Sequence, residues 1–101
     1  MKLSDDPFVR ELLPEFVENW LFDIDTQFDE LVQNKKQDDL YRLAHTLKGS
    51  CFQFGLEHIA HLGIELMGYA KKADWENAVL MKEKIKNSFI EVRDYLKNNP
   101  E

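Results

Sequence analysis

A single predicted helical turn, His45-Thr46-Leu47-Lys48-Gly49, combines the residue types needed to handle a phosphoryl group. The apolar residues around it recur at helical spacing, and on a wheel of about 100° per residue His45 points roughly 160° away from their mean direction. Lys48 and Gly49, at i+3 and i+4, are the nearest neighbours of His45 on the helix surface. We therefore expect an exposed imidazole with a cation beside it and free space next to it, which suits a bulky, negatively charged group carried on another protein. The apolar stripe consists of Leu40, Leu43, Ala44, Leu47, Cys51 and Phe54.

The chemistry of this turn follows from ordinary side-chain properties. An unperturbed imidazole has a pKa of about 6.5, so at neutral pH one nitrogen of an exposed His45 carries a free lone pair. Histidine can act as a nucleophile that forms a covalent phosphoryl intermediate, and Lys48 can offset the negative charge. Glycine within a helix costs roughly 1 kcal/mol relative to alanine. Because Gly49 faces away from the apolar stripe, we interpret it as giving a partner access rather than as a helix-packing contact.

The elements that position this turn are all predicted to be helices. Asp6 and Pro7 are typical of a helix start, and the first helix should run to about Leu13, where Pro14 kinks or breaks the chain. Pro14 then opens a second, longer helix whose stripe is Val17, Trp20, Leu21, Ile24, Phe28 and Leu31. The segment 34–37 is a polar connector.

Three further helices follow. Asp38 or Asp39 is expected to cap the third, which runs to about Phe54, with Gly55 as the C′ residue. The fourth starts near Leu56 and ends around residues 71–72. Asp74 is a good N-cap for the last helix, and residues 98–101 are expected to fray. The inward positions are Ile59, Leu62, Leu66 and Ala70 in the fourth helix, and Trp75, Ala78, Met81, Ile85, Phe89, Val92 and Leu96 in the last.

These patterns predict an all-α fold. No segment alternates like a strand, and the helices are joined by short connections. We expect an antiparallel up-down four-helix bundle with a short additional N-terminal helix as a lid, forming one domain over residues 1–101.

Composition narrows the possible partners. The formal net charge is −6 and the pI is about 5.0, which argues against nucleic-acid binding. No apolar run is long enough to cross a membrane, and no secretory signal is apparent, so we expect a cytoplasmic protein that binds no membrane. We expect a monomer, because the core needs only the chain's own helices. Residues 1–34 hold nine acidic and two basic residues. This segment is interpreted as a solvated acidic face, with a partner-selecting surface as the alternative.

The run from His45 to Gly55, HTLKGSCFQFG, resembles the signature of histidine-containing phosphotransfer (HPt) domains, H-x-L-K-G followed by small residues and a later glycine. The resemblance extends over essentially the whole chain and implies a four-helix bundle. It also implies that His45 accepts a phosphoryl group from a receiver-domain aspartate and passes it to another receiver. Lys48 would stabilise the phosphoryl charge, and Gly49 would leave room for the partner. The chain would need no cofactor of its own, because the receiver supplies the acidic pocket and Mg²⁺.

Two departures from the family pattern stand out. Cys51 and Phe52 occupy positions where many members have smaller or more polar residues. Met67 stands where some members place a glutamine that hydrogen-bonds the phosphohistidine, so that contact is not expected here.

A docking surface beside His45 is a further hypothesis. Tyr41 and Phe52 lie on the same helix face as His45, and exposed aromatic residues there would favour a protein interface. Alternatively, Phe8, Val9 and Leu12 of the N-terminal helix, or a neighbouring helix, would cover them. Arg42 and Gln53 are candidates for the border of the phosphoryl site.

Other chemically interesting residues have simpler interpretations. Cys51 lies on the apolar stripe and is expected to be a small buried hydrophobe. His58 and His61 are spaced i, i+3, but a pair of histidines alone does not predict a metal site, so none is expected. Gly63 and Gly68 are interpreted as permitting close helix approach or a bend.

Three functions remain open. The first is a phosphorelay carrier that neither binds ATP nor autophosphorylates, since no nucleotide-binding loop is present; its partners would be receiver domains and a hybrid sensor histidine kinase. The second is a phosphoacceptor domain cut from a larger hybrid or chemotaxis-type kinase. The third is an interaction module that binds receivers without phosphotransfer.

Overall fold

The computed structural model describes residues 3–99, and all of its regular structure is helical. Residues 1–2 and 100–101, including the end of the predicted frayed tail, lie outside this range. The helices are α1 (Pro7–Asp23), the π-helical segment η1 (Ile24–Phe28), α2 (Asp29–Gln33), α3 (Gln37–Gln53), α4 (Glu57–Lys71) and α5 (Trp75–Asn98). The part of the chain that the structure describes contains no strand.

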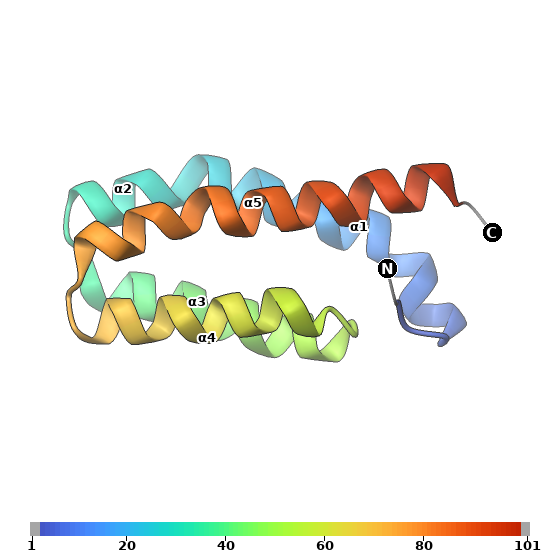
Figure 1. The fold of residues 1–101 in the computed structure, drawn as a ribbon, viewed down its shortest axis with the longest axis horizontal. Coiled ribbons are helices and arrows are strands. Elements are labelled where there is room, and N and C mark those ends of the chain that lie inside the picture. Colours follow the sequence, from blue (N-terminus) through green and yellow to red (C-terminus); the bar gives the residue numbers. More distant parts are fainter. Residues whose placement is uncertain (1–2, 100–101) are drawn as a thin grey trace.

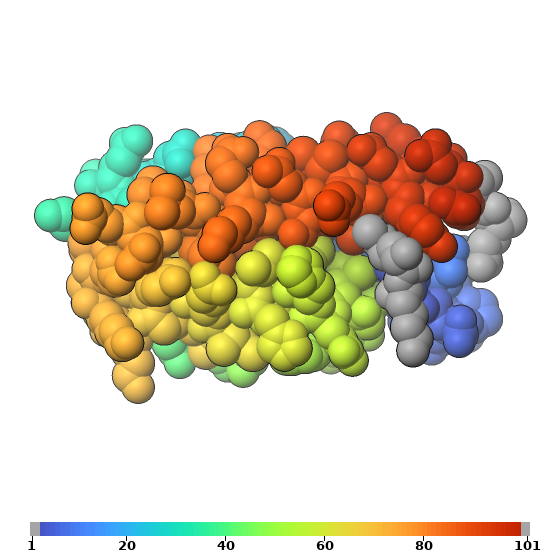
Figure 2. All heavy atoms as spheres, in the orientation of Figure 1, coloured from blue at the N-terminus to red at the C-terminus, as the bar shows by residue number. Residues whose placement is uncertain are grey.

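The helices form an elongated antiparallel bundle of about 42 × 19 × 17 Å. The elements α1, η1 and α2 follow one another as a single rod beside α5, while α3 and α4 form a hairpin on the other side (Figure 1). In the space-filling view, α5 and α4 cover the near face of the bundle, and their side chains fill the gap between the two ribbons (Figure 2). The predicted all-α bundle is confirmed.

The core follows the predicted apolar stripes. Every predicted stripe residue of the second helix is buried, as are most of those in the other three, whereas Leu43, Phe54, Leu62, Trp75 and Leu96 are only partly buried. Three aromatic rings link the rod to α5, since Phe89 lies 6.4 Å from Phe16 and 6.3 Å from Trp20 between ring centroids.

Pro14 lies inside α1, so the prediction of a separate N-terminal helix ending at Leu13 was wrong. A proline in a helix interior removes one hydrogen bond and kinks the helix. The first turns of α1 lie at an angle to the rest of the rod (Figure 1). The helix nevertheless continues, because Leu13 and Val17 on either side of the proline are fully buried in the core.

The three connections after α2, α3 and α4 share one geometry. Lys35, Gly55 and Ala73 have positive φ angles of 50°, 76° and 54°. In each case the next residue donates its N–H to a carbonyl five residues earlier, over 2.8–2.9 Å, which is the Schellman pattern. Gly55 was predicted to occupy this position, and Asp74 was correctly predicted to cap α5, since its side chain accepts the Asn77 N–H.

The predicted cap of α3 was wrong. The helix begins at Gln37, after Lys36, and the predicted caps Asp38 and Asp39 lie within its first turn. The Lys36 carbonyl accepts the first intrahelical bond, from the Leu40 N–H over 2.9 Å. The side-chain amide of Gln37 donates a hydrogen bond to the Lys71 carbonyl over 2.9 Å, which ties the start of α3 to the end of α4. The two aspartates still interact favourably with the positive end of the helix dipole.

Part of the acidic N-terminal segment is paired within the molecule. The α5 bases Lys82 and Lys86 lie 2.8 and 3.0 Å from the carboxylates of Asp29 and Asp25, and Arg93 lies 3.8 Å from Glu18. The hydrogen bond from Lys82 to Asp29 raises the pKa of Lys82. These carboxylates therefore have partners on α5 that the helix pattern did not predict.

Candidate functional site

His45 lies on the solvent-exposed face of α3, as predicted. The nearest residues of the apolar stripe, Ala44 before His45 and Leu47 after it, are buried in the core and hold this turn of the helix in place. Its ring lies near that of Tyr41, with centroids 6.5 Å apart and planes inclined by 26°. Helical side chains point back towards the N-terminus. The imidazole therefore lies over the turn that contains Tyr41 and Arg42.

Lys48 and Gly49 occupy the turn on the other side of His45. Lys48 is half-buried and makes no ion pair with any residue in the range 3–99. Gly49 is exposed, and a Cβ placed on it would meet no atom within 4 Å. The surface beside His45 is thus open at Gly49, as predicted, whereas Lys48 is less exposed than its two neighbours in the motif.

A shallow depression of about 430 Å³ adjoins the imidazole on its N-terminal side, lined by Asp38, Tyr41, Arg42 and His45. Arg42 Nη1 lies 3.3 Å from a carboxylate oxygen of Asp39. Asp38 was not among the predicted site residues. Its spacing of seven residues before His45, two helical turns, is the signal that would have placed it on this face.

The predicted docking residues remain exposed. The exposed fractions are 37% for Tyr41, 43% for Phe52, 53% for Leu12 and 76% for Phe8. Tyr41 and Phe52 are therefore partly covered, and His61 of the neighbouring helix α4 lies against Phe52, whereas Phe8 and Leu12 at the start of α1 are themselves exposed. Gln53 is also exposed, at the last position of α3.

The exposed apolar residues of α1 lie at the same end of the bundle as Phe52. The Phe16 ring of α1 stacks on Phe54, just after α3, with centroids 4.0 Å apart. A Cβ on Gly55 would lie 3.3 Å from the Ser4 Cβ, so the segment before α1 also reaches this corner. Tyr41, in contrast, lies eleven residues before Phe52, or about 16 Å along the helix.

The remaining candidates on α4 make packing contacts. Met67, at the position of the family glutamine, packs against the core. His61 contacts the Phe52 ring edge-on, with centroids 5.7 Å apart. Residues 3–99 contain no group of three or more histidine, cysteine, aspartate or glutamate side chains arranged to hold a metal ion.

The two glycines of α4 differ. A Cβ on Gly63 would lie 3.1 Å from the Lys48 amide nitrogen and 3.2 Å from the Ala44 carbonyl oxygen, so Gly63 allows the predicted close approach of α4 to α3. Gly68 has no such neighbour within 4 Å, so the close-approach interpretation was wrong there.

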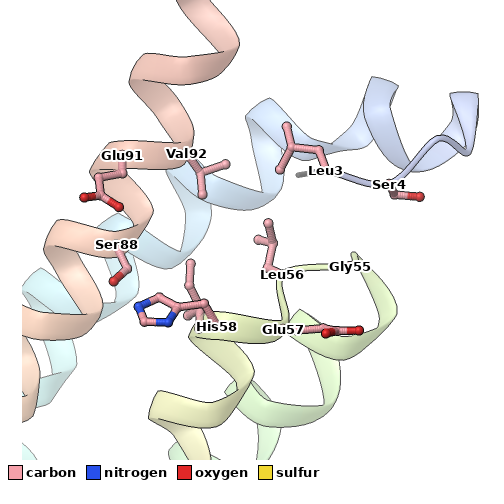
Figure 3. Close-up of a pocket in the computed structure, with 10 residues that line it drawn as sticks. Leu3, Ser4, Gly55, Leu56, Glu57, His58, Ser88, Glu91 and Val92 are labelled. Atoms are coloured by element: carbon pink, nitrogen blue, oxygen red, sulfur yellow. The ribbon is translucent and has the colours of Figure 1, made fainter. Parts of the chain in front are cut away.

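A second hollow, of about 390 Å³, lies between the start of α4, α5 and the segment before α1 (Figure 3). His58 enters it from α4 and Ser88 from α5, and Glu57 and Glu91 add two carboxylates (Figure 3). It shares no residue with the depression at His45. Its described lining holds these two carboxylates and no lysine or arginine to offset them, which makes it unsuited to a phosphoryl group.

Comparison with known proteins points to one family. A model of the Hpt domain matches residues 10–97. Neither the curated proteins nor the solved structures include a match. Among the described helices, none has the length and apolar character needed to span a membrane.

Proposed function

The chain belongs to the Hpt domain family, and from this premise we propose that it carries a phosphoryl group on His45 between receiver domains of a phosphorelay. Hpt domains are phosphocarrier modules, not kinases, and they interact with receiver domains. The relay role, the acceptor residue and the partners of this particular chain are our proposal.

The observation that carries the proposal is the setting of His45. The imidazole is exposed on a helix anchored by buried neighbours, with a cation three residues later and open space four residues later. Phosphoryl transfer asks little of a protein beyond positioning and charge neutralisation. This surface supplies both, and leaves room for a second protein to bring the phosphoryl group.

The proposed reaction is a direct exchange of the phosphoryl group. A ring nitrogen of neutral His45 attacks the phosphorus of an aspartyl phosphate on the receiver. The N–P bond forms as the P–O bond breaks, and the aspartate carboxylate leaves with the bonding electrons. Lys48 offsets the charge on the phosphoryl oxygens. Passage to a second receiver is the reverse reaction, and Mg²⁺ in each receiver would neutralise charge from the partner's side.

We propose that the receiver docks along the exposed face of α3 and the start of α1. Tyr41 and Phe52 flank His45 on this face, and Leu12 and Phe8 extend it at the α1 end. Apolar and aromatic residues in the centre of an interface, bordered by polar ones such as Arg42 and Gln53, are typical of protein–protein contacts. The half-buried Lys48 and open Gly49 lie within this footprint.

The test is phosphoryl uptake from a phosphorylated receiver domain with Mg²⁺, followed by mapping of acid-labile, alkali-stable phosphate by mass spectrometry. We expect phosphate on His45, and none on the His45→Gln variant. Because His45 is exposed, this variant should unfold at the same temperature as the unmodified protein. Phosphate elsewhere, or an unfolded variant, would contradict the assignment.

The same experiment separates the alternative functions. Binding to receivers without phosphoryl uptake would favour an interaction module. Uptake from a kinase domain encoded in the same gene would favour a phosphoacceptor domain of a larger kinase.

A further inference from the structure

We propose that Arg42 is a second phosphoryl-binding cation, held on Asp39 in the unmodified protein and transferred to the phosphoryl group when His45 is phosphorylated. This inference rests on the proposed function of His45. It adds a residue on the opposite side of the imidazole from Lys48, and it assigns Asp39 the role of a competing carboxylate.

The direction of the imidazole supports this assignment. The His45 ring lies over the preceding turn, where Tyr41 stacks against it and Arg42 lines the same depression. A phosphoryl group on the outer part of this ring would extend over that depression. Arg42 is three residues from His45, which places their Cβ atoms about 5–6 Å apart. The guanidinium can therefore reach the phosphoryl oxygens by rotation of its own side chain.

The ion pair that now holds Arg42 is weak enough to be exchanged. Its nitrogen–oxygen distance is 3.3 Å, and the Arg42 and Asp39 side chains are 74% and 52% exposed. Exposed ion pairs of this kind contribute little to the free energy of folding. A phosphoryl group carries more negative charge than a carboxylate and offers three acceptor oxygens, and arginine binds such groups with two parallel hydrogen bonds. The phosphoryl group should therefore outcompete Asp39.

The surrounding charges explain why a second cation is needed. Asp38 lines the same depression and Asp39 lies one residue further along, so two carboxylates lie on the side towards which the imidazole points. Lys48 alone would leave the phosphoryl group with a repulsive neighbour at Asp38. Arg42 would offset that repulsion.

The test measures the equilibrium between phosphorylated His45 and a phosphorylated receiver. The two phosphorylated proteins are quantified on a phosphate-affinity gel before the aspartyl phosphate of the receiver hydrolyses. Arg42→Gln should shift this equilibrium towards the phosphorylated receiver by about two- to fivefold, the range expected for losing an exposed charge pair. Asp39→Asn should shift it the other way, because Arg42 is released. Arg42→Lys should restore part of the loss, as it keeps the charge without the bidentate geometry.

An equilibrium distinguishes this role from docking. A residue that only helps the receiver to bind changes the forward and reverse rates equally and leaves the equilibrium constant unchanged. The matched control is Lys84→Gln, which removes another exposed ion-paired cation, 3.8 Å from Glu65 on a different pair of helices. It should leave the equilibrium unchanged.

The outcomes separate the two proposals. If His45 of the protein without substitutions takes up phosphate and Arg42→Gln leaves the equilibrium unchanged, Arg42 is not a phosphoryl ligand and the proposed function stands. A shift of equal size in Lys84→Gln would also overturn the inference, because it would reflect net charge alone. If His45 takes up no phosphate from any receiver, the proposed function itself fails.

Discussion

The two faces of α3 differ in how closely other atoms approach the backbone. On the buried face, α4 comes so near that a Cβ on Gly63 would lie 3.1 Å from the Lys48 amide nitrogen. On the exposed face, Gly49 has no neighbour within 4 Å. Gly63 thus permits close packing on the buried face, and Gly49 leaves space for a partner on the exposed face. Because the buried face holds α3 in place, the outer face can keep an exposed imidazole and a helix-weakening glycine.

The largest contrast between the faces should be chemical reactivity. Cys51 is fully buried, and desolvation raises the pKa of its thiol to about 12. The thiolate is the reactive form. At pH 8 we expect alkylation to require unfolding and to be slower than in the unfolded chain by about a thousandfold or more. Iodoacetamide labelling with and without denaturant, followed by mass spectrometry, measures this ratio.

The same pKa shift has a consequence at alkaline pH. The native thiol stays protonated up to about pH 12, whereas the thiol of an unfolded chain ionises near pH 9. The unfolded state therefore loses a proton first, and the stabilising contribution of this group falls as the pH rises from about 9 to 12. In the labelling experiment at pH 8, rapid alkylation of Cys51 in the native protein would contradict the first prediction, because it would show that the inner face of α3 opens readily.

Filling the narrow gap on the inner face should cost stability. Gly63→Ala places a methyl group against backbone atoms of Ala44 and Lys48, which cannot rotate away. We expect a loss of about 1–3 kcal/mol, measured by urea unfolding, as for other overpacked cores. Gly68→Ala is the control on the same helix, and should stabilise by up to about 1 kcal/mol because its Cβ has free space. Equal effects at both positions would mean that α4 does not depend on close contact with α3.

The sequence predicted the exposed face of α3 better than the boundaries around it. Periodicity was sufficient to place His45 outside and Leu47 inside, because amphipathic spacing reflects burial directly. The course of α1 through Pro14 was missed, because packing of Leu13 and Val17 outweighs the local cost of a proline. Packing partners are not visible in a single helix pattern.

The connections show the same limit. Gly55 was predicted because glycine favours a positive φ. Lys35 and Ala73 adopt the same backbone conformation without any such signature, since the Schellman hydrogen bonds and the helices on both sides impose it. The ion pairs between α5 and the acidic rod were likewise missed, because they join residues more than fifty positions apart.

On the exposed face, Lys48 should affect rate more than stability. Lys48→Ala removes a half-buried cation next to the proposed acceptor, and we expect transfer from a phosphorylated receiver to slow by about tenfold, equivalent to about 1.4 kcal/mol of lost charge stabilisation. Rapid-quench measurement of the transfer rate tests this. Lys48→Arg should retain most of the rate, since it keeps the charge. An unchanged rate in Lys48→Ala would make this lysine a bystander.

Replacing Gly49 should change stability only slightly, and this change should have the opposite sign to the effect on transfer. Gly49→Gln replaces a glycine with a better helix former and should stabilise the protein by about 0.5 kcal/mol. Its side chain would lean towards His45, one turn earlier, and obstruct the approaching receiver. We expect slower transfer together with a slightly higher unfolding temperature.

Gly68→Gln is the matched variant for this test. Both glycines are exposed within helices and have free space around the position of a Cβ, so both substitutions should raise stability by a similar amount. Only the one at position 49 lies beside His45. If both variants transfer phosphate at the same rate, the open surface at Gly49 has no role in partner access. If only Gly49→Gln is slow, the protein keeps a less stable helix because a receiver must reach its histidine.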